Sequence, residues 1–179
     1  MGELTALVPK LAGQRVLVIG DVILDEYLTG RATRMSREAP VPVLELEARH
    51  LVPGGAANPA ANVAALGSTA SLAGVIGTDT SADTLRQVLD GRGISTHLLL
   101  SDATRPTTVK MRIMAQMGLR FPQQVARLDT LSREPISLEI ERQLGVVIAA
   151  EMRRAQAVLL SDYHTGLLTP ALVSMVRTL

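Results

Sequence analysis

The chain has 179 residues, enough for one domain with a sizeable core, which must be largely aliphatic because aromatic residues make up only 2% of it. Its net charge of +1, without a block of basic residues, disfavours nucleic acid and anionic membranes as partners. The lack of cysteine excludes disulfides and thiolate metal sites, and the lack of a membrane-length apolar segment or a signal-peptide pattern indicates a cytoplasmic protein.

The first structured segment is an apolar run over Arg15–Gly20, which predicts a strand buried on both faces of a parallel sheet. Asp21 and Asp25 follow it, at the edge where open α/β sheets place their ligands. Carboxylates there can accept hydrogen bonds from sugar hydroxyls. The alternative is that Asp21 caps a turn and Asp25 is a solvated loop residue.

A second candidate site begins at Gly54 and Gly55, in the run Pro53-Gly54-Gly55-Ala56-Ala57-Asn58 before a small-residue helix expected over 56–66. Glycines let the main chain approach a ligand closely, and the first turn of a helix offers unpaired N–H groups to hydroxyl or phosphate oxygens. The Asn58 amide suits polyol recognition, although it could instead cap the helix. We expect a small-molecule site here, with a structural turn as the alternative.

The rest of the chain alternates strands and helices. Further buried strands are expected over 69–75 and 157–161, and helices over 81–92, 138–154 and 170–179. This order predicts a doubly wound, mainly parallel α/β sheet with helices on both faces.

Two segments depart from this rhythm. Residues 41–47 alternate in part and residues 107–114 alternate clearly, so both are expected as strands with one solvated face. The period of two puts Thr108, Lys110 and Arg112 on one face of the second segment. These cations could bind a phosphate or could simply keep the surface solvated.

Taken together, the motifs of this chain resemble those of the PfkB/ribokinase family of carbohydrate kinases. The glycine pair with Asn58, Ala60, Gly67 and Gly77 resembles the family's first signature. Five further runs resemble its heptose-7-phosphate kinase branch, the kinase half of the enzymes of ADP-heptose synthesis: Gly20-Asp21-Val22-Ile23-Leu24-Asp25, Ser36-Arg37-Glu38-Ala39-Pro40-Val41-Pro42-Val43, Lys110-Met111-Arg112, Arg127-Leu128-Asp129 and Ser161-Asp162-Tyr163.

The resemblance implies a ribokinase-like fold in which a small β lid, at about 31–52 and 105–129, covers the sugar and supplies a homodimer contact. It implies an ATP-dependent, Mg²⁺-assisted kinase of a sugar phosphate, with D-glycero-β-D-manno-heptose 7-phosphate as the favoured acceptor. The implied substrate-binding residues are Asp25, ranked above Asp21, with Gly54, Gly55 and Asn58 for the sugar, Lys110, Arg112 and Arg127 for its phosphate, and Asp162 for a hydroxyl or metal-linked role.

The chain departs from the family in two respects. The heptose branch usually has a lysine shortly after its Asp-Tyr pair, whereas this chain has His164-Thr165-Gly166, which leaves the phosphate handling and the exact substrate open. The family's catalytic base lies in a later Gly-Ala-Gly-Asp motif, which this sequence lacks, and no Walker motif replaces the nucleotide site.

We therefore interpret the chain as the N-terminal part of one kinase domain, truncated at its C-terminus, inactive alone and with its base beyond Leu179. One alternative is a non-catalytic sugar-phosphate-binding or oligomerisation module. Another is a kinase of the same family for a different acceptor, such as a fructose phosphate or a nucleoside.

Overall fold

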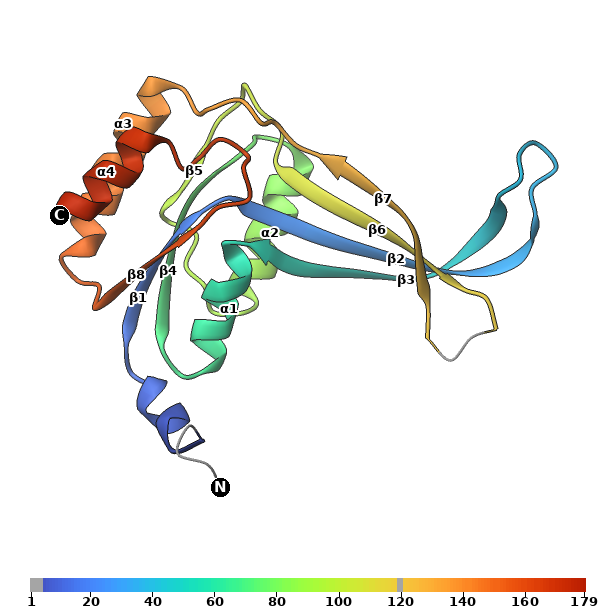
Figure 1. The fold of residues 1–179 in the computed structure, drawn as a ribbon, viewed down its shortest axis with the longest axis horizontal. Coiled ribbons are helices and arrows are strands. Elements are labelled where there is room, and N and C mark those ends of the chain that lie inside the picture. The colour runs from blue at the N-terminus through green and yellow to red at the C-terminus, as the bar shows by residue number, and fades with distance from the viewer. Residues whose placement is uncertain (1–4, 119–120) are drawn as a thin grey trace.

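The computed structural model describes residues 5–118 and 121–179, which form a helix-covered sheet and a second sheet that projects from it (Figure 1). The first sheet contains β1 (Arg15–Gly20), β4 (Thr69–Ile76), β5 (Leu99–Ser101) and β8 (Ala157–Ser161). Its order is β5-β4-β1-β8, and all of its strand pairs are parallel. All three predicted strands are therefore present, and β5 is an addition to them. The expectation that 157–161 is buried is wrong, because β8 lies at the edge of the sheet and its apolar side chains are exposed.

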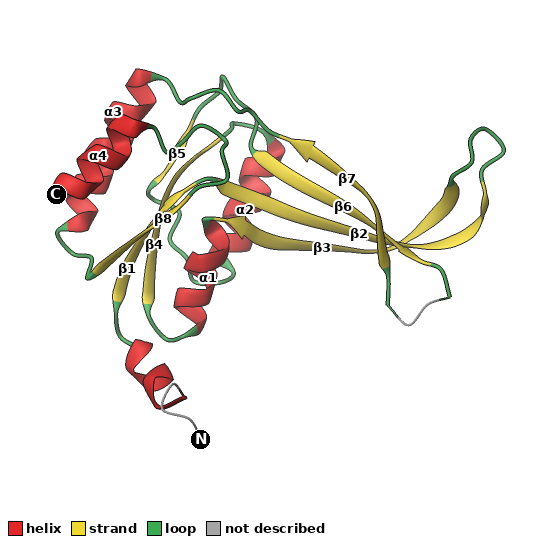
Figure 2. Cartoon of the chain, viewed as in Figure 1, coloured by secondary structure: helices red, strands yellow, loops and turns green. Residues whose placement is uncertain are grey.

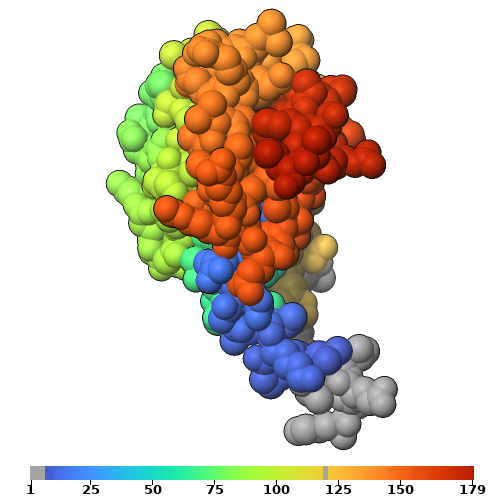
Figure 3. Space-filling model, turned by 90° about the vertical axis from the view of Figure 1, so that its left-hand side faces the viewer, coloured from blue at the N-terminus to red at the C-terminus, as the bar shows by residue number. Residues whose placement is uncertain are grey.

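Helices cover both faces of this sheet. They are α1 (Ala57–Ala65), α2 (Thr80–Asp90), α3 (Leu138–Met152) and α4 (Pro170–Thr178), after a 3₁₀ helix at Thr5–Leu11. Val18 and Leu72 pack in a core with α1 and α2, whereas Leu17 and Ile19 pack in a second core with α3 and α4. Alternate residues of one strand thus point into opposite cores, which confirms the predicted doubly wound arrangement. Figure 3 shows α3 and α4 side by side on one face of the molecule.

The helix boundaries follow from local capping. The side chains of Asp79, Ser137 and Thr169 each accept a hydrogen bond from a backbone N–H in the first turn of α2, α3 and α4, respectively. Pro170 occupies the start of α4, where a missing N–H has no consequence. No described helix is long and apolar enough to cross a membrane.

The second sheet, here called the lid sheet, contains β2 (Val22–Met35), β3 (Pro42–Gly55), β6 (Thr108–Gln116) and β7 (Gln123–Thr130) in the order β3-β2-β6-β7. The β2·β6 pair is parallel, and the other two pairs are antiparallel. Figure 2 shows it as an arm of strands without helices. It includes residues 22–30 and 53–55, which lie outside the segments expected for the lid. Val22, Ile23 and Leu24 are all buried, so the base of β2 does not alternate.

Where the chain first passes from one sheet to the other, a single residue separates them. β1 ends at Gly20 and β2 starts at Val22, so Asp21 alone separates a central strand from a lid strand. β8 lies at one edge of the first sheet and carries partly exposed Val158, Leu159 and Leu160, whereas Leu17, Val18 and Ile19 of β1 are fully buried. The carboxyl ends of β1 and β8 and the base of the lid sheet therefore meet at the same edge.

Candidate functional site

An ion pair between Asp25 and Arg112 lies at the base of the lid sheet. Asp25 is in β2, so it is not the solvated loop residue of the alternative interpretation, and it is in register with Lys110 of β6. Arg112 Nη1 donates to Asp25 Oδ1 over 2.7 Å, and each side chain is 19% exposed. Burial lowers the pKa of Arg112, but the hydrogen bond and the charge of Asp25 raise it more, so the guanidinium stays charged.

The glycine pair lies directly against the two aspartates. A Cβ built on Gly54 would lie 2.5 Å from Asp25 Oδ2, and a Cβ on Gly55 would overlap the backbone oxygen of Asp21. Gly55 also has a φ of +54°, a conformation that side chains disfavour. Both glycines are buried, so their local effect is to let β3 lie close to the carboxylate of Asp25.

Lys110 and Arg112 share one face of β6, as the alternation predicted, and each lies over a tyrosine ring. Lys110 Nζ lies 5.0 Å from the centroid of Tyr163, and Arg112 Cζ lies 5.0 Å from that of Tyr27. Cation–π contacts of this kind orient a charged group while leaving its donors free for an anion. Sequence reasoning assigned no role to Tyr27, although it lies two residues after Asp25 and so shares its face of β2.

Arg127 lies on the same face of the lid sheet, in register with Arg112. Its Nε and Nη2 atoms donate to Asp129 Oδ1 and Oδ2 over 2.8 and 2.9 Å. Arg127 is therefore already paired with a carboxylate of its own strand, unlike Lys110. This pair was not predicted, although the spacing of Arg127 and Asp129 could have indicated it, because residues two apart on a strand lie on the same face.

Asn58 lies at the start of α1 with its side chain exposed. The N-cap of this helix is Ala56, without a side-chain cap, so Asn58 does not cap it. Among the described residues the Asn58 amide has no hydrogen-bond partner, and it projects at the helix end that bears partial positive charge.

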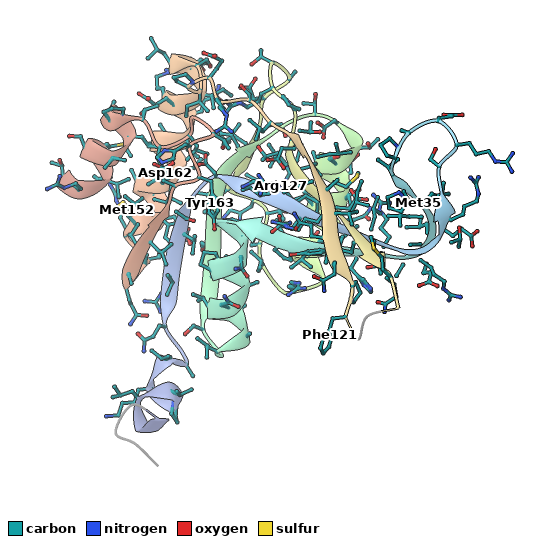
Figure 4. The ribbon with its side chains drawn as sticks, turned by 45° about the vertical axis from the view of Figure 1, so that its right-hand side comes forward. Met35, Phe121, Arg127, Met152, Asp162 and Tyr163 are labelled. Carbon is teal, nitrogen blue, oxygen red and sulfur yellow. The ribbon has the colours of Figure 1, made fainter. Side chains whose placement is uncertain are left out.

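Asp162 and Tyr163 lie next to each other just after β8 (Figure 4). Asp162 is exposed and accepts a hydrogen bond from the backbone N–H of His164 over 2.8 Å, and the His164 ring lies 3.4 Å from its other oxygen. His164 has a φ of +57°, which is uncommon outside glycine and keeps the loop tightly turned.

The described residues contain no group of three acidic or histidine side chains that could hold a metal ion. Mg²⁺ bound with a nucleotide needs only one or two protein carboxylates, and Asp162 is the exposed carboxylate on this edge. One carboxylate without a phosphate-binding loop does not make a nucleotide site.

Asp21 differs from the other charged residues of the predicted site because it is buried. Its Oδ2 atom accepts the backbone N–H groups of Tyr163 and Thr165, from the loop after β8. The predicted sugar-side groups Asp25, Gly54 and Gly55 and the cations Lys110 and Arg112 come together around the base of the lid. Asp21 lies beneath the adjoining loop.

Comparisons with a family model and with curated proteins point to the same family. A model described as pfkB family carbohydrate kinase matches residues 14–121. The bifunctional protein HldE of Geotalea uraniireducens is 40% identical over 174 residues, which are 97% of this chain and 34% of that protein. HldE of Helicobacter pylori strain J99 is 40% identical over 166 residues, 93% of this chain and 35% of that protein. The chain thus spans about a third of the length of these curated relatives.

Solved structures show the same fold. The crystal structure of phosphofructokinase-2 from Escherichia coli with substrates and products aligns with a TM-score of 0.64 and 15% identity, over 93% of this chain and 50% of that one. The structure of Arabidopsis thaliana ribokinase complexed with ribose and ATP aligns with a TM-score of 0.55 and 20% identity, over 83% of this chain and 45% of that one. At these identities the likeness shows the fold alone.

Proposed function

Because the chain belongs to the pfkB family of carbohydrate kinases, we propose that it binds the acceptor of an ATP-dependent phosphoryl transfer to a phosphorylated sugar. The favoured acceptor is D-glycero-β-D-manno-heptose 7-phosphate, since the relatives that match most of this chain at about 40% identity are named HldE. A fructose phosphate or a nucleoside is the alternative acceptor, and a binding panel distinguishes them.

The observation that carries this proposal is the polar face at the base of the lid sheet. Arg112 holds Asp25 Oδ1, and Asp25 Oδ2 has no hydrogen-bond partner among the described residues. That oxygen can accept a sugar hydroxyl, with the exposed Asn58 amide as a second polar group. Lys110, which is not ion-paired within the described part of the chain, supplies a point charge for the phosphate already on the sugar. Gly54, Gly55, Arg127 and Asp162 complete the proposed site, and Asp162 faces a hydroxyl or a metal-bound phosphate.

The phosphoryl donor in this proposal is ATP with Mg²⁺, and the general base that takes the acceptor proton belongs to a Gly-Ala-Gly-Asp motif. This sequence has no such motif. The chain by itself is therefore expected to bind the acceptor without phosphorylating it. The missing motif equally favours a non-catalytic sugar-phosphate-binding module, and the transfer of phosphate from ATP, followed by ³¹P NMR, separates the two functions.

Calorimetry on the 179-residue chain tests acceptor binding. The wild type should bind heptose 7-phosphate, and Asp25→Asn should weaken this binding at least about tenfold, because a charge-assisted hydrogen bond contributes about 1.5–3 kcal/mol. Asp83→Asn, an exposed change on α2, serves as the control. Absence of heptose phosphate binding by the wild type would exclude the proposed function.

The lid sheet is also the proposed homodimer contact. Met35, Leu46, Val125 and Leu128 are apolar side chains on this sheet that are each more than 40% exposed. Exposed apolar surface of this kind marks interaction sites. Leu128 is adjacent to Arg127 and Asp129 and so lies on the opposite face from the site cations.

Sedimentation equilibrium tests the dimer. Leu128→Glu should convert it to a monomer, whereas Leu138→Glu, on the exposed surface of α3, should leave it intact. A wild-type chain that sediments as a monomer at all concentrations would rule out the lid contact.

A further inference from the structure

Asp21 is a buried carboxylate that connects the two halves of the site edge. It is 1% exposed and is the single residue between β1 and β2. Its Oδ2 atom accepts N–H groups from Tyr163 over 2.7 Å and from Thr165 over 3.2 Å, donors 142 and 144 residues away in sequence. Burying a carboxylate is costly unless hydrogen bonds compensate it, so the N–H groups of the loop stabilise the buried carboxylate. The carboxylate in turn holds the loop in place through the same hydrogen bonds.

The main chain of Asp21 reinforces the same junction. Its N–H donates to the backbone carbonyl oxygen of Ser161 at the end of β8, and its own carbonyl oxygen accepts from the backbone N–H of Ala56 at the start of α1. Asp21 Oδ1 is buried without a hydrogen-bond partner in the described part of the chain, so the loop N–H groups are the donors that stabilise this charge. One residue thus joins the ends of β1 and β8 to the helix that follows the glycine pair.

The loop held by Asp21 carries Asp162 of the proposed site and the Tyr163 ring that Lys110 contacts. Asp162 and Tyr163 are exposed, and the Tyr163 ring lies under Lys110 Nζ. Arg105 restrains the loop from another side, since its Nη2 atom donates to the backbone carbonyl oxygens of Thr165 and Glu134. A loop restrained on both sides presents Tyr163 in one orientation, and the Tyr163 ring in turn orients Lys110.

We propose that Asp21 is a positioning residue for the acceptor site: its buried carboxylate fixes the loop at 162–165 and thereby holds Asp162, Tyr163 and the Lys110 ammonium in the geometry that binds a sugar phosphate. The proposal rests on the proposed function. It gives Asp21 an indirect role, because a side chain that is 1% exposed reaches a ligand only if the loop moves.

Hydrogen exchange of the ligand-free chain, measured by NMR, tests the link. Asp21→Asn should accelerate exchange at the Tyr163 and Thr165 amides at least about tenfold, since the lost interaction is a charge-assisted hydrogen bond. The matched control is Asp79→Asn, because Asp79 likewise accepts two backbone N–H groups, from Ala82 and Thr107, neither of them in this loop. Equal exchange at Tyr163 and Thr165 in Asp21→Asn and the wild type would overturn the link.

Calorimetry with heptose 7-phosphate tests its consequence. Asp21→Asn should weaken binding at least about fivefold, and Asp79→Asn should leave it unchanged, as expected if the loop hydrogen bonds position Lys110. Should Asp21→Asn fail to fold, Arg105→Gln releases the other restraint on Thr165 and should weaken binding in the same direction. If Asp21→Asn folds and binds heptose 7-phosphate as tightly as the wild type, the positioning role is overturned. If Asp21→Asn does not fold, wild-type affinity in Arg105→Gln overturns it. Neither result bears on the proposed function. A wild type that binds no sugar phosphate removes the proposed function, whatever the exchange data show.

Discussion

The carboxylate of Asp25 and the backbone of Gly54 are packed so closely that no side chain fits between them, since a Cβ on Gly54 would lie 2.5 Å from Asp25 Oδ2. This contact connects two motifs that are separate in the sequence. The glycine pair that resembles a ligand-binding turn also fixes the position of the aspartate proposed to hold the sugar. The same oxygen of Asp25 is the one that Arg112 leaves unpaired.

Gly54→Ala should therefore displace Asp25 and weaken heptose phosphate binding about tenfold or more, with a loss of about 1–3 kcal/mol in the free energy of unfolding from overpacking. Calorimetry and urea unfolding measure the two effects. Gly91→Ala is the control, because the nearest atom to its Cβ would be 3.4 Å away. Unchanged affinity in Gly54→Ala would show that Asp25 does not contact the ligand.

Arg112→Lys should not restore the heptose phosphate binding that Arg112→Ala loses. A guanidinium can hold Asp25 Oδ1 and still stack on Tyr27, whereas an ammonium is a compact point charge without the planar donor geometry. Both variants should bind heptose phosphate at least about tenfold more weakly than the wild type in calorimetry. Arg142→Ala, which breaks the exposed pair with Glu139 on α3, should have no effect. Full affinity in Arg112→Lys would contradict a role for the planar group.

The Tyr163 ring should matter more than its hydroxyl. Tyr163→Phe keeps the face on which Lys110 lies and should retain affinity within about twofold, whereas Tyr163→Ala should lose about two- to fivefold, the contribution of a partly exposed cation–π contact. Calorimetry with heptose 7-phosphate measures both affinities. Equal affinities in the two variants would exclude the stacking role.

Acid stability should depend on two aspartates outside the site. Burial raises the pKa of Asp79, but hydrogen bonds from Thr107 and Ala82 lower it more, and the Thr104 hydroxyl lowers the pKa of Asp102 despite its burial. Both fall below the ordinary value of 3.8, so their stabilisation is complete above pH 3.8 and is lost as the pH falls through the lowered values.

Urea unfolding between about pH 6 and about pH 3 measures this dependence. Asp79→Asn and Asp102→Asn should each flatten the loss of unfolding free energy below about pH 4, because each removes a group that takes up its proton at lower pH when folded. If the unfolding free energy of either variant falls with pH as steeply as that of the wild type, the hydrogen bonds to that aspartate are not the cause of the acid sensitivity.

Much of this arrangement could be predicted from the sequence, because its signals are local. The run at Arg15–Gly20 is buried on both faces from Leu17 onward, and the alternation at 108–112 sets one face of β6, so both were predictable from periodicity. The base of β2 was not, because Val22, Ile23 and Leu24 are buried on both faces where the lid sheet joins the domain. Its apolar run lacks the alternation by which a lid strand is recognised.

The contacts between distant segments could not be predicted either. Asp21 and Tyr163 are 142 residues apart, and nothing in either neighbourhood indicates that a carboxylate would be buried under that loop. The same holds for Lys110 and Tyr163, whose contact depends on how the lid sheet meets the end of β8. Residue types and spacing indicated which groups could bind a sugar phosphate. The fold determines which of them stay free to do so.

The most direct test of the proposed acceptor site compares heptose 7-phosphate with the same heptose lacking its phosphate, titrated into the wild type and into Lys110→Ala. We expect Lys110→Ala to weaken binding of the phosphorylated sugar about tenfold or more and to change binding of the unphosphorylated sugar by no more than about twofold, because in the proposed site Lys110 contacts only the phosphate. Equal losses for the two ligands, or no loss for either, would contradict the assignment of this lid face to the substrate phosphate.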